Sequence, residues 1–95
     1  MSPQVPSGRI TVPTAVVRRS FGAETVLLNL TTGQYHGLNA TGARMLDLLE
    51  ETGDAPETAR RVAEEADVPE EIVAGDLADL CEALSERGLI EIADS

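Results

Sequence analysis

The stretch that most constrains the fold is residues 24–49, ETVLLNLTTGQYHGLNATGARMLDLL. Two short apolar segments, 24–30 and 34–38, are separated by Thr31-Thr32-Gly33, where Gly33 can adopt the positive φ that a bulged hairpin turn needs. Asn39 follows the second segment, and its side chain can accept amide hydrogens from the first turn of a helix. We therefore predict a β-hairpin that leads directly into a helix.

The position of the turn decides which side chains share a face, because neighbours along a strand point to opposite sides. If Leu30 and Gln34 flank the turn, one face carries Val26, Leu28, Leu30, His36 and Leu38. The other face then carries Leu27, Asn29 and Tyr35. On this register we expect Tyr35 either to pack across the strands on Leu27 or to contact a ligand.

The segments on either side complete a small α+β domain. Residues 1–11 are predicted to be a flexible N-terminal segment, because three of the five prolines fall within residues 1–13. A first strand is expected from Val12 or Thr14 to Phe21, with Gly22-Ala23 as a short connection to the hairpin. Three consecutive strands with short turns favour an antiparallel sheet, since parallel pairing needs a long crossover. The segment 34–38 then lies at an edge of the sheet.

Apolar residues at helical spacing predict three helices, at about residues 40–51, 56–66 and 69–87. Gly53-Asp54 separates the first two helices, Asp67-Val68 separates the last two, and Gly88 ends the third. Residues 89–92 are expected to form a short closing strand or an extended tail. The predicted fold is winged-helix-like, with a three-stranded antiparallel sheet followed by three helices, and the domain is expected to span residues 12–92.

The composition excludes several classes of protein. The chain has 95 residues, 42% of them hydrophobic, and no Trp, so one aliphatic core is expected. Residues 1–44 hold four arginines and one acid, whereas residues 45–95 hold three arginines and sixteen acids. The net charge of −10 opposes nucleic-acid binding. Because signal-peptide and membrane-spanning patterns are lacking, we expect a soluble, cytoplasmic protein without membrane contact.

The residue content gives little support to catalysis. His36 is the only histidine and Cys81 the only cysteine, and they fall on different predicted elements. Cys81 lies within the apolar stripe of the third helix, which is typical of a buried thiol. No residues have metal-ligand spacing, and no glycine-rich phosphate loop is present. We expect a non-enzymatic protein with no catalytic residues, metal or cofactor.

Peptide binding is better supported. An open edge strand can accept an extended peptide as an additional strand, and Gln34–Leu38 has neither Lys nor Pro to prevent pairing. Val73, Leu77 and Leu80 on the third helix would line a groove beside it. Two alternatives stay open: His36 either belongs to this groove or fills the junction of sheet and helix, and Leu77 and Leu80 either line the groove or belong to the core.

Several motifs carry a family resemblance. They are Gly33-x-Tyr35-x-x-Leu38-Asn39-x-Thr41-Gly42-Ala43, then Asp76-Leu77 and Leu80, and finally Gly88-Leu89-Ile90. In this order and spacing, across residues 12–92, the chain resembles the PqqD-like peptide chaperones, also called recognition elements of ribosomally made, modified peptides. Within that family it most resembles the stand-alone leader-binding proteins of lasso-peptide biosynthesis. Many of these have Trp where Met45 or Leu46 stands here, a difference that concerns core packing.

The resemblance implies that the leader region of a precursor peptide, typically with a Tyr-x-x-Pro pattern, adds as a fourth strand beside Gln34–Leu38. It also implies that the precursor passes to a leader peptidase of the cysteine protease class and to an ATP-dependent cyclase. The resulting peptide-binding residues are Leu30, Gln34, Tyr35, His36, Gly37, Leu38, Val73, Asp76, Leu77 and Leu80.

Two other functions remain as alternatives. One is a PqqD-type chaperone that delivers a peptide to a radical SAM enzyme, as in pyrroloquinoline quinone synthesis. The other is a winged-helix DNA-binding regulator, suggested by the helix–turn–helix spacing of residues 56–87. A DNA reader should present Arg, Lys, Asn or Gln on its recognition helix. The third helix instead offers Glu70, Glu71, Asp76, Asp79 and Glu82.

Overall fold

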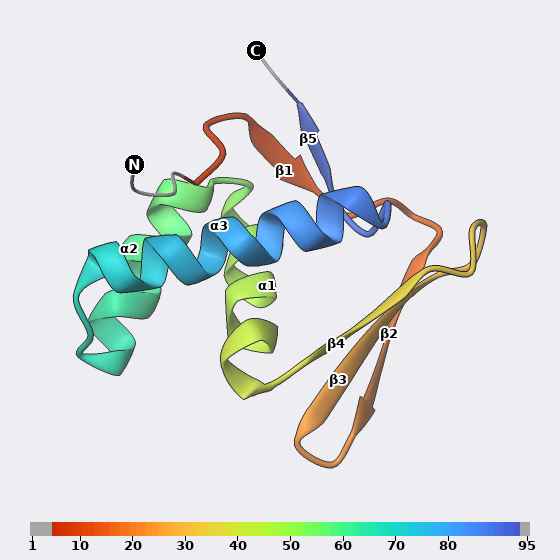
Figure 1. The fold of residues 1–95 in the computed structure, drawn as a ribbon, viewed down its shortest axis with the longest axis horizontal. Coiled ribbons are helices and arrows are strands. Elements are labelled where there is room, and N and C mark those ends of the chain that lie inside the picture. The colour runs from red at the N-terminus through yellow and green to blue at the C-terminus, as the bar shows by residue number, and fades with distance from the viewer. Residues whose placement is uncertain (1–4, 94–95) are drawn as a thin grey trace.

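The structure, a computed structural model, describes residues 5–93 and places them in two small sheets and three helices (Figure 1). The elements are β1 (Arg9–Thr11), β2 (Val16–Phe21), β3 (Glu24–Asn29), β4 (Tyr35–Leu38), α1 (Ala40–Thr52), α2 (Ala55–Ala66), α3 (Glu70–Glu86) and β5 (Glu91–Ala93). One sheet has the order β2-β3-β4 and the other pairs β1 with β5, with every pairing antiparallel. The predicted α+β class, with a three-stranded antiparallel sheet followed by three helices, is confirmed.

The helices begin and end where local side-chain chemistry dictates. The Asn39 side chain accepts a hydrogen bond from the Gly42 amide at 2.8 Å, which confirms the predicted N-cap of α1. Gly53 ends α1 in the left-handed region at φ 65°, where a side chain would be strained. The next residue, Asp54, then caps α2 by accepting from the Glu57 amide at 3.1 Å. The two helices are therefore joined by a tight turn.

The β1–β5 pair joins the two ends of the described chain. Arg9 lies opposite Ala93 and Ile10 opposite Ile92, and Ile10 is only 2% exposed. The segment expected to be a flexible lead-in therefore contributes a strand and a core residue, although its residues 1–4 lie outside the described range. The strand expected from residue 12 or 14 begins at Val16.

The β3–β4 hairpin differs from the predicted register by one residue. Thr25 pairs with Leu38 and Leu27 with His36, so Thr25, Leu27 and Asn29 share the inner face with His36 and Leu38. The expectation that Val26, Leu28 and Leu30 share this face was wrong, and of the two roles left open for Tyr35 the packing on Leu27 is excluded by this register. Tyr35 lies opposite Leu28 on the outer face and is 67% exposed.

The side chain of Asn29 explains this register. Its Oδ1 accepts hydrogen bonds from the amides of Thr31 at 2.9 Å and Thr32 at 3.2 Å, which makes Asn29 the first residue of the turn. The Asn29 amide donates to the Gln34 carbonyl at 2.9 Å, so these two residues close the loop in place of Leu30 and Gln34. A shift of one residue moves every side chain of a strand to the other face.

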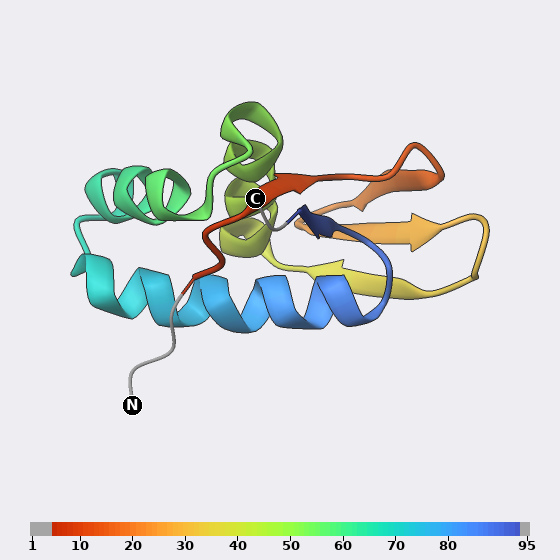
Figure 2. The same cartoon turned by 90° about the horizontal axis from the view of Figure 1, so that it is seen from above.

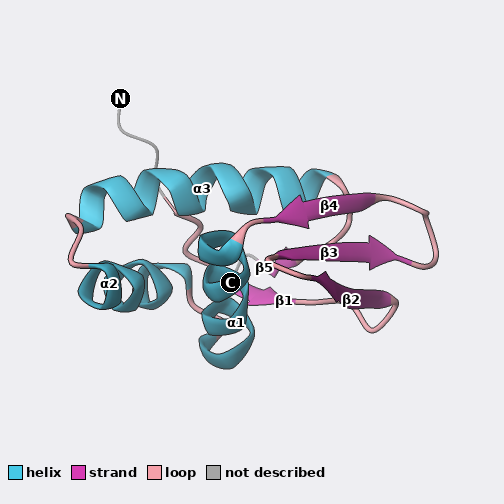
Figure 3. Cartoon of the chain, turned by 90° about the horizontal axis from the view of Figure 1, so that it is seen from below, coloured by secondary structure: helices cyan, strands magenta, loops and turns pink. Residues whose placement is uncertain are grey.

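The core lies between the helices and the inner face of the three-stranded sheet. Leu27 and Leu38 of the sheet and Leu89 and Ile90 after α3 join a cluster of buried aliphatic residues from the three helices. The helix α3 runs along the side of the molecule next to β4, with β3 and β2 beyond it (Figures 2 and 3). None of the described helices combines the length and the apolar composition that crossing a bilayer requires.

Candidate functional site

The strand β4 is an edge of its sheet, and no described strand pairs with its outer side. Because Asn29 donates to Gln34, these two form a hydrogen-bonded pair, and such pairs alternate along an antiparallel ladder. His36 accordingly bonds to Leu27. Tyr35 and Gly37 direct their N–H and C=O groups to the open side. Two complete sets of backbone donors and acceptors are thus available at this edge.

Two adjoining hollows, of about 370 and 460 Å³, extend along β4. They share His36 and Gly37, and we call the two together the β4–α3 groove. The first is lined by His36, Gly37, Leu38, Asn39, Thr41, Gly42, Met45, Asp76 and Leu80. The second is lined by Thr32, Gly33, Gln34, Tyr35, His36, Gly37 and Arg87. The groove therefore runs from the start of α1 to the β3–β4 turn.

One face of α3 forms the wall of the groove opposite β4. Asp76 and Leu80 lie four residues apart on one side of the helix, and Arg87, the residue that follows α3, lies seven residues after Leu80. Leu80 is half-buried between the exposed Asp76 and Arg87. The wall thus has an aliphatic centre and one charge toward each end.

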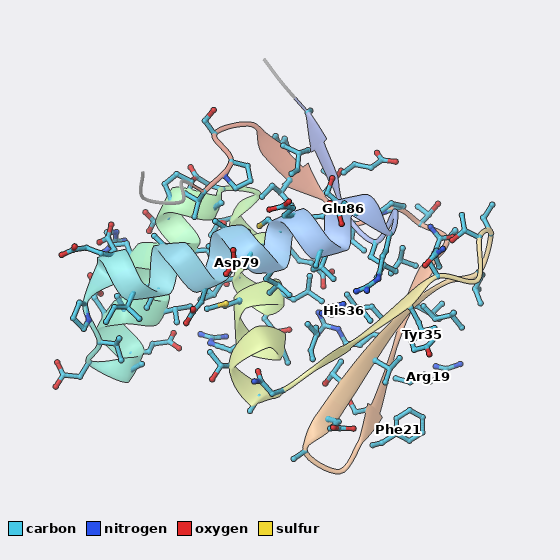
Figure 4. All side chains as sticks on the ribbon, viewed as in Figure 1. Arg19, Phe21, Tyr35, His36, Asp79 and Glu86 are labelled. Atoms are coloured by element: carbon cyan, nitrogen blue, oxygen red, sulfur yellow. The ribbon has the colours of Figure 1, made fainter. Side chains whose placement is uncertain are left out.

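His36 connects the strand to this wall. Its ring lies on the helix side of the sheet, whereas Tyr35, Arg19 and Phe21 lie on the opposite side (Figure 4). The Arg87 guanidinium donates a hydrogen bond to Nδ1 of His36. Arginine only donates, so Nδ1 accepts and the neutral ring carries its hydrogen on Nε2. Partial burial, followed by the positive charge of Arg87, lowers the pKa of His36 and favours this neutral form.

The predicted site residues separate into three groups. Gln34, Tyr35, His36, Gly37, Leu38, Asp76 and Leu80 line the groove. Val73 and Leu77 are buried in the core below it, with Leu77 0% exposed, and they line neither hollow. Leu30 lies in the turn, is 64% exposed and is outside both hollows.

Other groove residues were missed by the sequence analysis: Thr32, Gly33, Asn39, Thr41, Gly42, Met45 and Arg87. Arg87 had a usable signal, because it follows Leu80 by seven residues on the same helical face. The direction in which α1 leaves β4 brings Thr41, Gly42 and Met45 to the groove. The sequence pattern alone does not specify that direction.

Cys81 is held away from the groove. It is 1% exposed within the core cluster, and burial raises the pKa of its thiol to about 11, so the thiolate is disfavoured. It lines neither of the hollows that His36 lines. Among residues 5–93, no three His, Cys, Asp or Glu side chains come together as potential metal ligands. The groove is suited to hydrogen bonding and apolar contact.

Comparisons with known proteins find the same fold in two solved structures. The structure of TbiB1 in complex with the TbiA(beta) leader peptide is 40% identical and has a TM-score of 0.74, over 88% of this chain and 99% of that one. A lasso peptide synthetase B1 complexed with the leader peptide shares the fold at 23% identity, with a TM-score of 0.77 over 87% of this chain and 98% of that one. No curated protein matches. The sequence profile described as coenzyme PQQ synthesis protein D (PqqD) matches residues 24–90. The chain belongs to the PqqD family.

Proposed function

We propose that this protein binds the leader region of a ribosomally made precursor peptide, of the lasso type, by strand addition to β4. The observation that supports this most is the open edge of β4, where Tyr35 and Gly37 present unpaired backbone groups beside the groove. A peptide in the extended conformation would complete a four-stranded sheet. The likeness to two proteins solved with leader peptides supports the same choice of ligand.

The groove supplies the selectivity that backbone pairing lacks. Alternate side chains of an added strand point to the same side, so every second residue of the peptide would face α3. The first hollow, with Leu38, Met45 and Leu80 among its lining residues, offers apolar contact to one such side chain. An aromatic or branched aliphatic residue, such as the Tyr or Pro of a Tyr-x-x-Pro pattern, fits this chemistry.

The bound peptide would be presented for reaction elsewhere. The sequestered thiol of Cys81 and the hydrogen-bonded ring of His36 support a role without catalysis. We propose that the partners are a leader peptidase of the cysteine protease class and a cyclase, all in the cytoplasm. Lys and Arg contacts to phosphate are not available on α3, whose first turn carries Glu70 and Glu71, so nucleic acid is not proposed as a partner.

A second pathway has one observation in its favour. The family profile is named for coenzyme PQQ synthesis, which fits a chaperone that delivers a peptide to a radical SAM enzyme. The two roles differ in which enzyme the protein stimulates. Faster leader cleavage by a lasso-type cysteine protease would support the first role, and faster turnover of a peptide-modifying radical SAM enzyme would support the second.

The test of strand addition is a matched pair of variants at Gly37. A fluorescently labelled TbiA(beta) leader peptide is titrated, and we expect a Kd of about 1 μM, equivalent to about −8 kcal/mol. Gly37→Pro removes an N–H directed at the peptide and should weaken binding at least about tenfold. Gly37→Ala keeps that N–H, and its Cβ meets no atom within 4 Å, so affinity should stay within about twofold. Equal affinities for the proline and alanine variants would contradict strand addition at β4.

A further inference from the structure

The β4–α3 groove has opposite charges at its two ends. The His36 ring, which lines both hollows, is neutral. Asp76 is therefore the one charged side chain among the residues lining the first hollow, and Arg87 is the one charged side chain among those lining the second. Arg87 directly follows α3 and lies eleven residues after Asp76 in the sequence. The first hollow adjoins the end of β4 at Leu38, and the second adjoins its start at Tyr35.

Neither charge is neutralised by the described part of the protein. Arg18, Arg44, Arg60 and Arg61 each form an ion pair with at least one carboxylate. Arg87, like Arg9 and Arg19, has no carboxylate within ion-pairing distance among residues 5–93. One of its donors contacts His36, which leaves further N–H groups available. Asp76 likewise lacks a cationic partner within the described range.

We infer that the groove selects peptides by charge polarity, with a cationic side chain toward the peptide's N-terminal end and an anionic one toward its C-terminal end. This inference rests on strand addition at β4. Every strand pair in the described structure is antiparallel, so we take the added strand to run antiparallel to β4, which places its N-terminal part beside Leu38 and therefore beside Asp76. Its C-terminal part lies beside Tyr35 and Arg87, where the guanidinium can pair with a carboxylate.

The groove also restricts the spacing of the two charges in the peptide. Side chains on one face of a strand are separated by an even number of residues. Both charged side chains must face α3, so the cationic residue should precede the anionic residue by an even number of positions.

The test is a selection of displayed twelve-residue random peptides against the purified full chain, with binders retained only if Gly37→Pro abolishes their capture. We expect the retained sequences to be enriched in Lys or Arg an even number of residues before Asp or Glu. Selection against the double variant Asp76→Arg with Arg87→Asp should reverse that order. Both side chains are exposed, so the double variant should fold, which circular dichroism checks.

A matched control and a titration complete the test. Asp79→Asn changes an acid on another face of α3, where Asp79 lines a separate hollow with Pro6 and Ile92, and it should leave the polarity unchanged. A resynthesised binder with its two charges exchanged should bind about tenfold more weakly in low salt, a difference that shrinks in 1 M NaCl. Retained binders without charge polarity would overturn this inference and leave strand addition intact. A selection that yields no Gly37-dependent binder would overturn both.

Discussion

Arg87, the residue immediately after α3, donates a hydrogen bond to Nδ1 of His36 in the middle of β4. This contact joins the helical wall of the groove to its strand, across 51 positions of sequence. It also fixes the ring tautomer and leaves the Nε2 hydrogen of His36 for another acceptor. The edge strand is thereby held beside α3 before any peptide is bound.

The first prediction concerns the pH dependence of stability. Partial burial and the nearby Arg87 lower the pKa of His36 in the folded state below its ordinary value of 6.5. Between that lowered value and 6.5 the unfolded chain binds more protons, so this residue makes the free energy of unfolding fall as the pH falls. His36→Asn keeps an acceptor near Nδ1 but does not titrate. Measured by urea unfolding, the free energy of unfolding should fall less between pH 7.5 and pH 5.5 in the variant than in the wild type. An equal fall would contradict the lowered pKa of His36.

The second prediction separates core from groove on α3. Leu77 is fully buried, so Leu77→Ala should lower the free energy of unfolding by about 2–5 kcal/mol. Leu80 is half-buried and lines the groove, so Leu80→Ala should cost less stability but weaken peptide binding about fivefold. Denaturant unfolding and peptide titration of both variants make the comparison. An unchanged peptide affinity in Leu80→Ala would show that Leu80 does not contribute to peptide binding.

The third prediction concerns the hairpin turn. Besides the two turn amides bound by its oxygen, Asn29 donates from Nδ2 to the Gly88 carbonyl at 2.8 Å, and so joins the turn to the end of α3. Asn29→Ala removes three hydrogen bonds, and we expect the free energy of unfolding to fall by about 2–3 kcal/mol. Thr32→Ala removes one exposed contact to the Gln34 amide and serves as the control, with a loss below about 1 kcal/mol. Similar losses in both variants would argue against the central role of Asn29.

The fourth prediction compares two glycines. A Cβ on Gly8 would overlap the carbonyl oxygen of Ala93, which is backbone and is held by the β1–β5 pair. Gly8→Ala should therefore lower the thermal midpoint by several degrees, the effect of about 1 kcal/mol or more in a domain of this size. Gly37→Ala, which meets open space, should leave the midpoint within about 2 °C. A scanning calorimeter resolves this difference, and equal midpoints would contradict the close approach at Gly8.

The fifth prediction concerns the thiol of Cys81. With its pKa raised to about 11 by burial, almost no thiolate is present in the folded protein at pH 8. We expect reaction with Ellman's reagent to be slower than that of the urea-unfolded chain by at least about a hundredfold. Fast modification in native buffer would show that the core opens around α3.

The sequence predicted the helices well because their signals are local. Asn39, Gly53 and Asp54 act within a few residues of themselves, and the apolar stripe of α3 indicates coarsely which side is buried. The hairpin was predicted in the correct place, yet its register was wrong. The deciding contacts come from one side chain, Asn29. Its bonds to the Thr31 and Thr32 amides are a local turn signal that was overlooked, whereas its bond to Gly88 is visible only in three dimensions.

The same contrast applies to the groove. The edge position of β4 follows from the order of the strands, and Leu80 and Asp76 follow from helical spacing. Leu77 lies in the core and Leu80 in the groove because of the rotation of α3 against the sheet. An apolar stripe defines that rotation only coarsely. The β1–β5 pair depends on contact between three-residue segments at opposite ends of the chain, and such short segments carry no periodic signal.

That pairing of β1 with β5 also bears on how the chain can be rearranged. Since Arg9 and Ala93 lie opposite each other, a short Gly-Ser linker from residue 93 to residue 9 would close the segment 9–93 into a ring. Reopening it at the exposed Gly22-Ala23 turn would give a circular permutant with every strand and helix intact. Its new ends would emerge at the tip of the β2–β3 hairpin, a convenient place to attach a reporter.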